Sequence, residues 1–165
     1  SPGGKKTGKF TYYEDWTGFN IPSYVLEPFY RGLFDPLSKR ETFLLDLFKD
    51  KHKTIFYVIG TFGQLQECLK HEIAHGLFYT NPEYKSKVLK VLSTMHGEDR
   101  DTFATVLLDM GYHQSVLDDE IQAYLVDNLE WLAKHNIEGN IFPRLHQQLR
   151  VIFEMYFPST EIVTE

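Results

Sequence analysis

Residues 54–79 read TIFYVIGTFGQLQECLKHEIAHGLFY, and this stretch decides the fold that we expect. Its first part, residues 54–60, is a dense run of β-branched and aromatic side chains that ends at a glycine, which is typical of a strand. No proline interrupts residues 61–79, and apolar side chains recur there at intervals of three and four. That spacing predicts an amphipathic helix, so we expect a strand followed by a helix.

The rest of the chain adds mainly helices. Ser38 and Glu41 have the spacing of a capping box, which predicts a helix over residues 38–51. Apolar repeats predict further helices over residues 82–96, 99–110, 115–134 (capped by Ser115 or Asp118) and 143–157. A short strand over residues 9–16 and a turn over residues 17–22 precede them. We therefore expect a helix-dominated α+β fold, with five or six packed helices and a small antiparallel sheet from the N-terminal third.

Length and composition favour one globular domain. The chain has 165 residues, of which 42% are hydrophobic, and this is enough for a single buried core. Residues 1–8 contain Pro2 and three glycines with almost nothing apolar, so we expect a disordered leader there. Residues 9–165 are then expected to form one domain.

Charge and cysteine content restrict the partners and the compartment. A net charge of −6 argues against nucleic acid as a partner, because such binding needs clustered Lys and Arg. No stretch approaches the roughly 18 uncharged apolar residues of a membrane-spanning helix, so we expect no membrane partner. Cys68 is the only cysteine, which excludes an intramolecular disulfide and a zinc site built from several thiolates. A reducing, cytoplasmic location fits best.

The predicted helix carries His71-Glu72-Ile73-Ala74-His75, which matches the HExxH pattern. Residues four apart lie on one helical face, so the two imidazoles can reach one metal ion. Glu72 lies beside them, where its carboxylate can accept a proton from a water held by the metal. Uncharged Ile73 and Ala74 suit a helix that is also packed into a core. The pattern therefore predicts a Zn²⁺ site with Glu72 as the general base.

A hydrolytic zinc site has three protein ligands and one open position, so a third ligand is needed from elsewhere. The best candidate is Glu120, which ends an acidic run at a predicted helix start and borders the apolar stripe that begins at Ile121. Asp119 and His113 are the alternatives for the same role.

The sequence also bears on three other kinds of metal site. A metzincin extension of the motif needs Gly at position 78 and His at position 81, where this chain has Phe78 and Asn81. A di-iron bundle needs a second Glu-x-x-His pair, but Glu120 is followed by Ala123 at that spacing. A mononuclear iron site with two His and one carboxylate remains open, because ligand identity alone does not choose the metal.

The HExxH helix, followed some forty residues later by Glu120-x-x-Ala123, resembles the gluzincin-like zinc metallopeptidases, in particular compact members of the anti-repressor-protease type. The resemblance covers roughly residues 54–132. It implies that His71, His75 and Glu120 bind Zn²⁺ and that Glu72 is the base for peptide-bond hydrolysis. A peptide or protein is then the implied substrate.

Two further sets of site residues are expected, and the resemblance implies only the first of them. In such peptidases an edge strand before the active helix commonly pairs with an extended substrate, which here would involve Tyr57, Val58 and Ile59. Tyr124, His113 and Tyr112 are the candidate donors for stabilising the transition state. Two alternatives remain: a metal-stabilised, non-catalytic interaction module of the same fold, and an unrelated helical domain in which the motif arose by chance.

Overall fold

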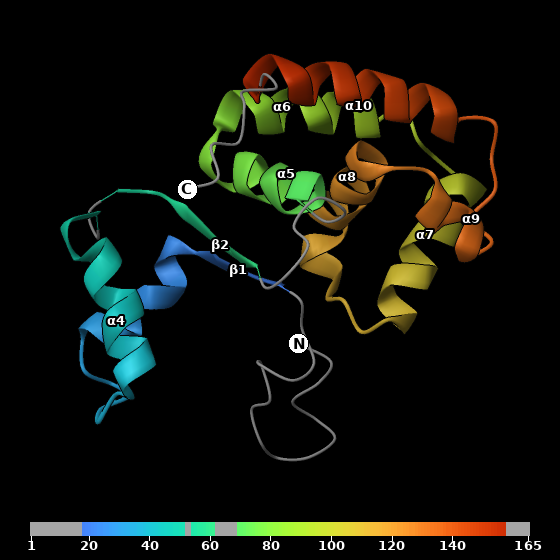
Figure 1. The fold of residues 1–165 in the computed structure, drawn as a ribbon. Coiled ribbons are helices and arrows are strands. Elements are labelled where there is room, and N and C mark those ends of the chain that lie inside the picture. Colours follow the sequence, from blue (N-terminus) through green and yellow to red (C-terminus); the bar gives the residue numbers. More distant parts are fainter. Residues whose placement is uncertain (1–17, 52–53, 62–68, 158–165) are drawn as a thin grey trace.

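The computed structural model describes residues 18–51, 54–61 and 69–157. Within these ranges it contains two strands and eight α-helices, which confirms the expected helix-dominated α+β class (Figure 1). The strands are β1 (Gly18–Pro22) and β2 (Tyr57–Thr61). The α-helices are α3 (Glu27–Tyr30), α4 (Lys39–Phe48), α5 (Leu69–Thr80), α6 (Pro82–Leu92), α7 (Glu98–Asp109), α8 (Leu117–Asp127), α9 (Glu130–Lys134) and α10 (Phe142–Tyr156). Short 3₁₀ helices are η1 (Ser23–Leu26), η2 (Lys49–Lys51) and η3 (Gln114–Val116).

The two strands form an antiparallel ribbon in which Asn20 pairs with Ile59. The turn predicted over residues 17–22 is therefore wrong, because Gly18–Pro22 is a strand. Pairing with β2 satisfies the backbone of this segment and overrides the turn preference of its Gly, Asn and Pro residues. The predicted second strand is confirmed but begins at Tyr57 and extends to Thr61, so no helix begins at residue 61. The predicted strand over residues 9–16 and the predicted leader lie outside the described residues.

Side-chain caps set several helix boundaries. The predicted capping box is confirmed: Ser38 Oγ accepts from the Glu41 amide at 3.3 Å, and Glu41 accepts from the Ser38 amide at 2.6 Å. The single helix predicted over residues 115–134 is wrong, because Asn128 divides it into α8 and α9. Asn128 is extended, with φ −161°, and its side chain accepts from the Glu130 and Trp131 amides. This cap starts a new helix in a new direction.

The main core lies among helices α5 to α10. Figure 1 shows α6 and α10 side by side above α5 and α8, with α7 and α9 at one end. We call this part the helical body. Its fully buried side chains come from several helices and include Tyr84, Phe103, Leu107, Ile121, Leu145 and Leu149. No helix among the residues that the structure describes is long and apolar enough to cross a bilayer.

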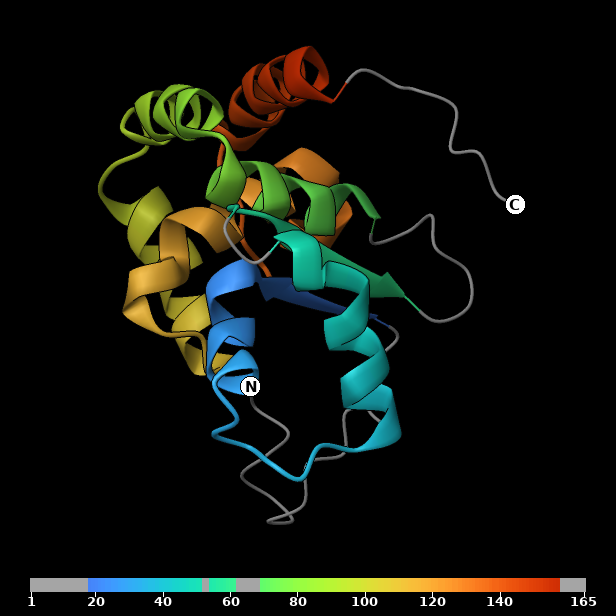
Figure 2. The ribbon, with the colours of Figure 1, turned by 90° about the vertical axis from the view of Figure 1, so that its left-hand side faces the viewer.

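A second, much smaller core lies where η1, α3 and α4 meet the β-ribbon, on the side of the molecule away from α9 (Figures 1 and 2). We call it the N-terminal cluster; its buried residues are Leu26, Leu45 and Val58. Many large apolar side chains around it are exposed, including Tyr24, Leu33, Phe34, Phe43, Leu47 and Ile55. The ribbon itself packs against α5, which brings it next to the HExxH helix.

Candidate metal centre

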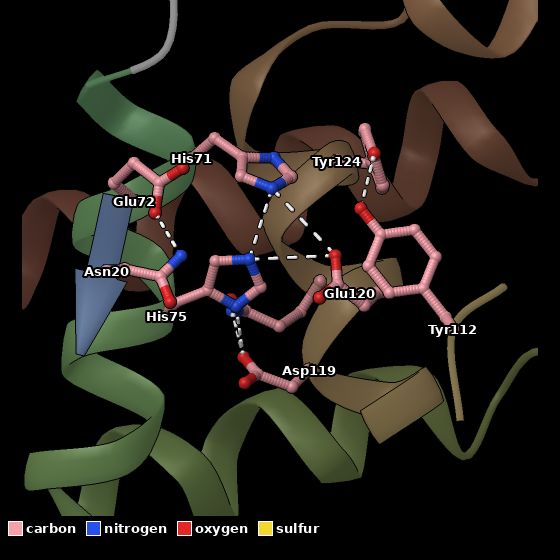
Figure 3. Close-up of polar contacts among 9 residues, drawn as sticks. Asn20, His71, Glu72, His75, Tyr112, Asp119, Glu120 and Tyr124 are labelled. Carbon is pink, nitrogen blue, oxygen red and sulfur yellow. Dashed lines mark hydrogen bonds and ion pairs between the residues drawn. The ribbon is translucent and has the colours of Figure 1, made fainter. Parts of the chain in front are cut away.

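Helix α5 brings the two predicted histidine ligands together. His71 and His75 are one turn apart, and their Nε2 atoms lie 3.1 Å from each other (Figure 3). Their rings meet edge to face, with centroids 4.7 Å apart. Both side chains are largely buried, His75 with only 5% exposure. Two imidazole nitrogens so placed can donate lone pairs to one point in space.

Helix α8 supplies the carboxylate at that point. Glu120 Oε2 lies 3.6 Å from His75 Nε2 and 3.9 Å from His71 Nε2. A tetrahedral zinc ion about 2.0–2.1 Å from each donor would set these atoms about 3.3 Å apart. The observed separations of 3.1, 3.6 and 3.9 Å are close to that spacing. His71, His75 and Glu120 also form the cluster of possible metal ligands found among the described residues.

Glu120 Oε2 is buried and has no hydrogen-bond partner in the part of the chain that the structure describes. A buried carboxylate oxygen without a partner is unfavourable, by about 1–3 kcal/mol or more. Coordination of a cation would satisfy this oxygen, so the residues present fit a metal ion.

A chain of buried polar groups holds His75 in position. His75 Nδ1 lies 2.8 Å from Asp119 Oδ1, and Gln122 donates to the same oxygen at 3.2 Å. Tyr84 in turn donates to Gln122 Oε1 at 2.8 Å, and both side chains are fully buried. When the His75 ring is neutral and Asp119 accepts from Nδ1–H, the Nε2 lone pair faces Glu120. This is the carboxylate–histidine arrangement that orients metal ligands.

Asp119, the first alternative ligand, contacts His75 and lies outside the set of converging donor atoms. Its carboxylate contacts the far side of the His75 ring, away from the Nε2 atoms of the cluster (Figure 3). His113 is the other alternative, and it lies outside the cluster. Its exposed imidazole bonds to Ser115 Oγ at 2.8 Å and caps η3.

Burial and neighbouring charges shift the pKa values of the three clustered residues in different directions. Burial, together with the charge of His75, lowers the pKa of His71 to about 3, so this ring is neutral. Burial alone would lower the pKa of His75, but the Asp119 hydrogen bond and the charges of Asp119, Glu120 and Glu72 outweigh it and raise that pKa. Burial raises the pKa of Glu120 to about 7, against the opposing effect of His75. Without a cation, the third ligand therefore tends to hold a proton.

Glu72, the predicted base, lies next to this cluster and is held by a residue from the ribbon. Asn20 Nδ2 donates to Glu72 Oε2 at 2.5 Å (Figure 3). Because both residues are half-buried, water competes only partly for this bond. The carboxylate thus has one oxygen engaged with β1.

Two of the three predicted donors lie beside the cluster. The Tyr112 and Tyr124 hydroxyls are 3.2 Å apart, and the Tyr124 ring packs on the His71 ring with centroids 4.6 Å apart. Burial raises the pKa of both phenols, so they keep their protons at neutral pH. One hydroxyl donates to the other, which leaves one O–H free to bond elsewhere. Trp131 stacks on Tyr124, with ring centroids 3.7 Å apart, and supports it.

The predicted substrate strand is present, but its side chains have different surroundings. Tyr57 packs over Gly76 of α5, Val58 is buried in the N-terminal cluster, and Ile59 pairs with Asn20. The described sheet has only two strands, so the second edge of β2 has no strand partner within it. Pairing of a peptide with Tyr57, Val58 and Ile59 stays a prediction.

Sequence reasoning missed three contributors: Asn20, Gln122 and Tyr84. Asn20 stood in a segment predicted to be a turn, and only strand pairing brings it to α5. Gln122 gave a usable signal, because it is a polar residue inside an apolar helical stripe, three residues after Asp119. Comparisons of the chain with protein-family models, curated proteins and solved structures found no match. The chemistry of the site therefore rests on its own residues.

Proposed function

We propose that this protein is a zinc-dependent peptidase that hydrolyses peptide bonds, with Glu72 as the general base. The observation that carries the proposal is the convergence of His71, His75 and Glu120, whose Oε2 has no hydrogen-bond partner among the described residues, with Glu72 beside them. Two imidazoles and one carboxylate form the ligand set used by catalytic zinc, and three protein ligands leave a position for water or substrate. The same ligand set supports the proposed relationship to gluzincin-like peptidases.

The proposed reaction divides the work between the ion and the chain. A bound zinc ion would lower the pKa of water to about 7 and polarise the substrate carbonyl. Glu72 takes one proton from the attacking water, whose oxygen bonds to the carbonyl carbon. It then gives this proton to the amine nitrogen as the C–N bond breaks, which regenerates the carboxylate.

The chain also offers donors for the negative charge that develops on the carbonyl oxygen. The paired hydroxyls of Tyr112 and Tyr124 have one O–H free, and their raised pKa keeps it protonated. A neutral donor aimed at the developing charge would lower the barrier. Asp119 and Gln122 meanwhile keep His75 in the tautomer that leaves Nε2 free.

The direct test couples metal analysis to digestion of a general peptide library. Wild type, Glu72→Gln and the exposed control Glu138→Gln should each bind one equivalent of zinc. Cleavage should fall by about 10²–10⁴-fold in Glu72→Gln, because the base is lost. The control should cleave like wild type. Wild-type protein that binds no zinc, or Glu72→Gln that cleaves normally, would overturn the proposal.

A second candidate is a metal-stabilised, non-catalytic interaction module of the same fold. It is favoured by the exposed apolar side chains around the N-terminal cluster, such as Phe43 at 66% and Leu33 at 70% exposure. Exposed apolar patches often mark protein-binding surfaces. Stoichiometric zinc without cleavage by either wild type or Glu72→Gln would favour this module over the peptidase.

A further inference from the structure

Strand β1 and the residue that follows it lie along helix α5 and contact it through two pairs of side chains. Asn20 donates to Glu72, and Ser23, which directly follows β1, has its hydroxyl 3.4 Å from that of Tyr79. The spacings agree: three residues of strand and seven residues of helix each span about 10 Å. Glu72 and Tyr79 are seven residues apart and so share one helical face. Contact at Tyr79 therefore brings Asn20 level with Glu72.

A glycine of α5 allows the ribbon to come this close. A Cβ atom on Gly76 would lie 3.3 Å from Tyr57 Cδ1 of β2 and 3.7 Å from its Cβ. The first of these is tighter than ordinary contact between carbon atoms. Gly76 directly follows His75, so the ribbon approaches α5 closely beside a candidate metal ligand.

From these contacts we infer that Asn20 is a positioning residue for the general base, holding Glu72 Oε2 so that the other carboxylate oxygen faces the reacting water. The inference rests on the proposed function of Glu72. Only the amide nitrogen of Asn20 can bond to an ionised carboxylate, so Asn20 is the donor and Glu72 is the acceptor.

Holding one oxygen of the carboxylate matters for proton transfer. A free Glu side chain rotates among several rotamers, and only some direct an oxygen at the metal cluster. The Asn20 hydrogen bond selects among them without using the second oxygen. Its donor comes from a strand 52 positions earlier in the chain, so the geometry depends on the ribbon and not on α5 alone. Asn20 would thus act through Glu72 and need not touch substrate.

The test uses Co²⁺-loaded full-length protein, whose visible absorption reports ligands at the metal. Two probes are titrated: acetohydroxamate, which chelates a metal and offers its acidic hydrogen to a neighbouring carboxylate, and azide, which has no such hydrogen. We expect Asn20→Ala to weaken acetohydroxamate about tenfold, the effect of one hydrogen bond to a charged group, and to leave azide unchanged. Asn20→Asp keeps the size but adds a like charge and should weaken acetohydroxamate further. The exposed control Asn140→Ala should match wild type.

A double-mutant cycle separates positioning from general damage. If Asn20 acts through Glu72, then Asn20→Ala should have no further effect on acetohydroxamate in a Glu72→Gln background. Additive losses, or equal losses for acetohydroxamate and azide, would overturn the inference because they indicate a merely structural role. An Asn20→Ala protein with unchanged acetohydroxamate affinity would overturn it as well, while leaving the peptidase proposal standing. Wild type that binds no Co²⁺ would overturn both.

Discussion

The helical body and the N-terminal cluster are built very differently, although the candidate site needs both. The body buries large side chains from six helices, among them Phe103, Leu107 and Leu145, with no measurable exposure. Among the described residues, the N-terminal cluster buries Leu26, Leu45 and Val58, and the apolar side chains that pack against it are only partly buried. Regions with few buried contacts open at lower free energy than well-packed cores.

This difference divides the site into two parts. The candidate metal ligands His71, His75 and Glu120 all lie on α5 and α8 within the body. Asn20, which bonds to the proposed base Glu72, comes from the ribbon that leads to the N-terminal cluster. We therefore expect metal binding to be robust and positioning of the base to be the sensitive step.

The largest expected effect tests the contrast between the two cores. Phe103→Ala should lower the free energy of unfolding by about 3–5 kcal/mol, because it empties a fully buried ring site. Leu45→Ala should lower the free energy of unfolding by about 2 kcal/mol, which is at the low end of the range for a buried Leu→Ala substitution. It should leave Co²⁺ binding intact. Chemical denaturation gives both values, and hydrogen exchange should locate the Leu45→Ala effect in residues 18–61. Faster exchange in α5 and α8 of Leu45→Ala would contradict the division.

The next effect concerns the support of His75 inside the body. Asp119→Ala should weaken zinc binding about 10–100-fold, because His75 loses the acceptor that orients it. Asp118→Ala is a matched control, since Asp118 pairs with Arg100 and not with a ligand. Competition against a chromogenic chelator measures both affinities. Equal losses in the two variants would show that only the local charge matters.

The residues that build the candidate site and its supports were not equally predictable from the sequence. His71 and His75 were predictable because helical periodicity alone puts them on one face, and Glu120 because an acid bordered an apolar stripe. Asn20 could not be predicted, because residues 17–22 favour a turn and its partner, Glu72, lies 52 positions later in the chain. The break at Asn128 was missed since one cap residue interrupts an otherwise continuous apolar repeat. Local periodicity and the capping box at Ser38 could be predicted from the sequence, whereas the long-range pairing of Asn20 and the break at Asn128 could not.

A smaller effect should appear in the pH dependence of the metal-free protein. Burial raises the folded-state pKa of Glu120 to about 7 from an ordinary 4.5, so the folded state holds this proton longer than the unfolded state. Stability from this group is therefore lost as pH rises from about 4.5 through 7. His71, with a folded pKa of about 3, acts in the opposite direction between 3 and 6.5.

Comparing thermal unfolding of wild type and Glu120→Gln between pH 4.5 and 8 reports on Glu120 together with its effect on His75, because the charge of Glu120 contributes to the raised pKa of that imidazole, whereas His71 is present in both proteins. Metal-free Glu120→Gln should become the more stable protein as pH rises. Glu138→Gln serves as the exposed control. An unchanged difference between wild type and Glu120→Gln across this range would contradict the raised pKa.

The smallest effect concerns the close approach of ribbon and helix. Gly76→Ala gains up to about 1 kcal/mol from helix propensity but crowds Tyr57, so the net change in stability should stay within about 1 kcal/mol. Zinc affinity should be unchanged, whereas acetohydroxamate affinity should fall, because Asn20 moves away from Glu72. Loss of zinc together with acetohydroxamate would mean that the ribbon also shapes the ligand cluster.

The central claim is that His71, His75 and Glu120 hold one zinc ion, and X-ray absorption at the zinc edge tests it most directly. Wild type loaded with zinc should bind one equivalent, with a spectrum of two imidazoles and oxygen donors, and Glu120→Ala should lose an oxygen donor or the ion itself. A wild-type spectrum without two imidazoles, or one that is unaltered in Glu120→Ala, would contradict the claim.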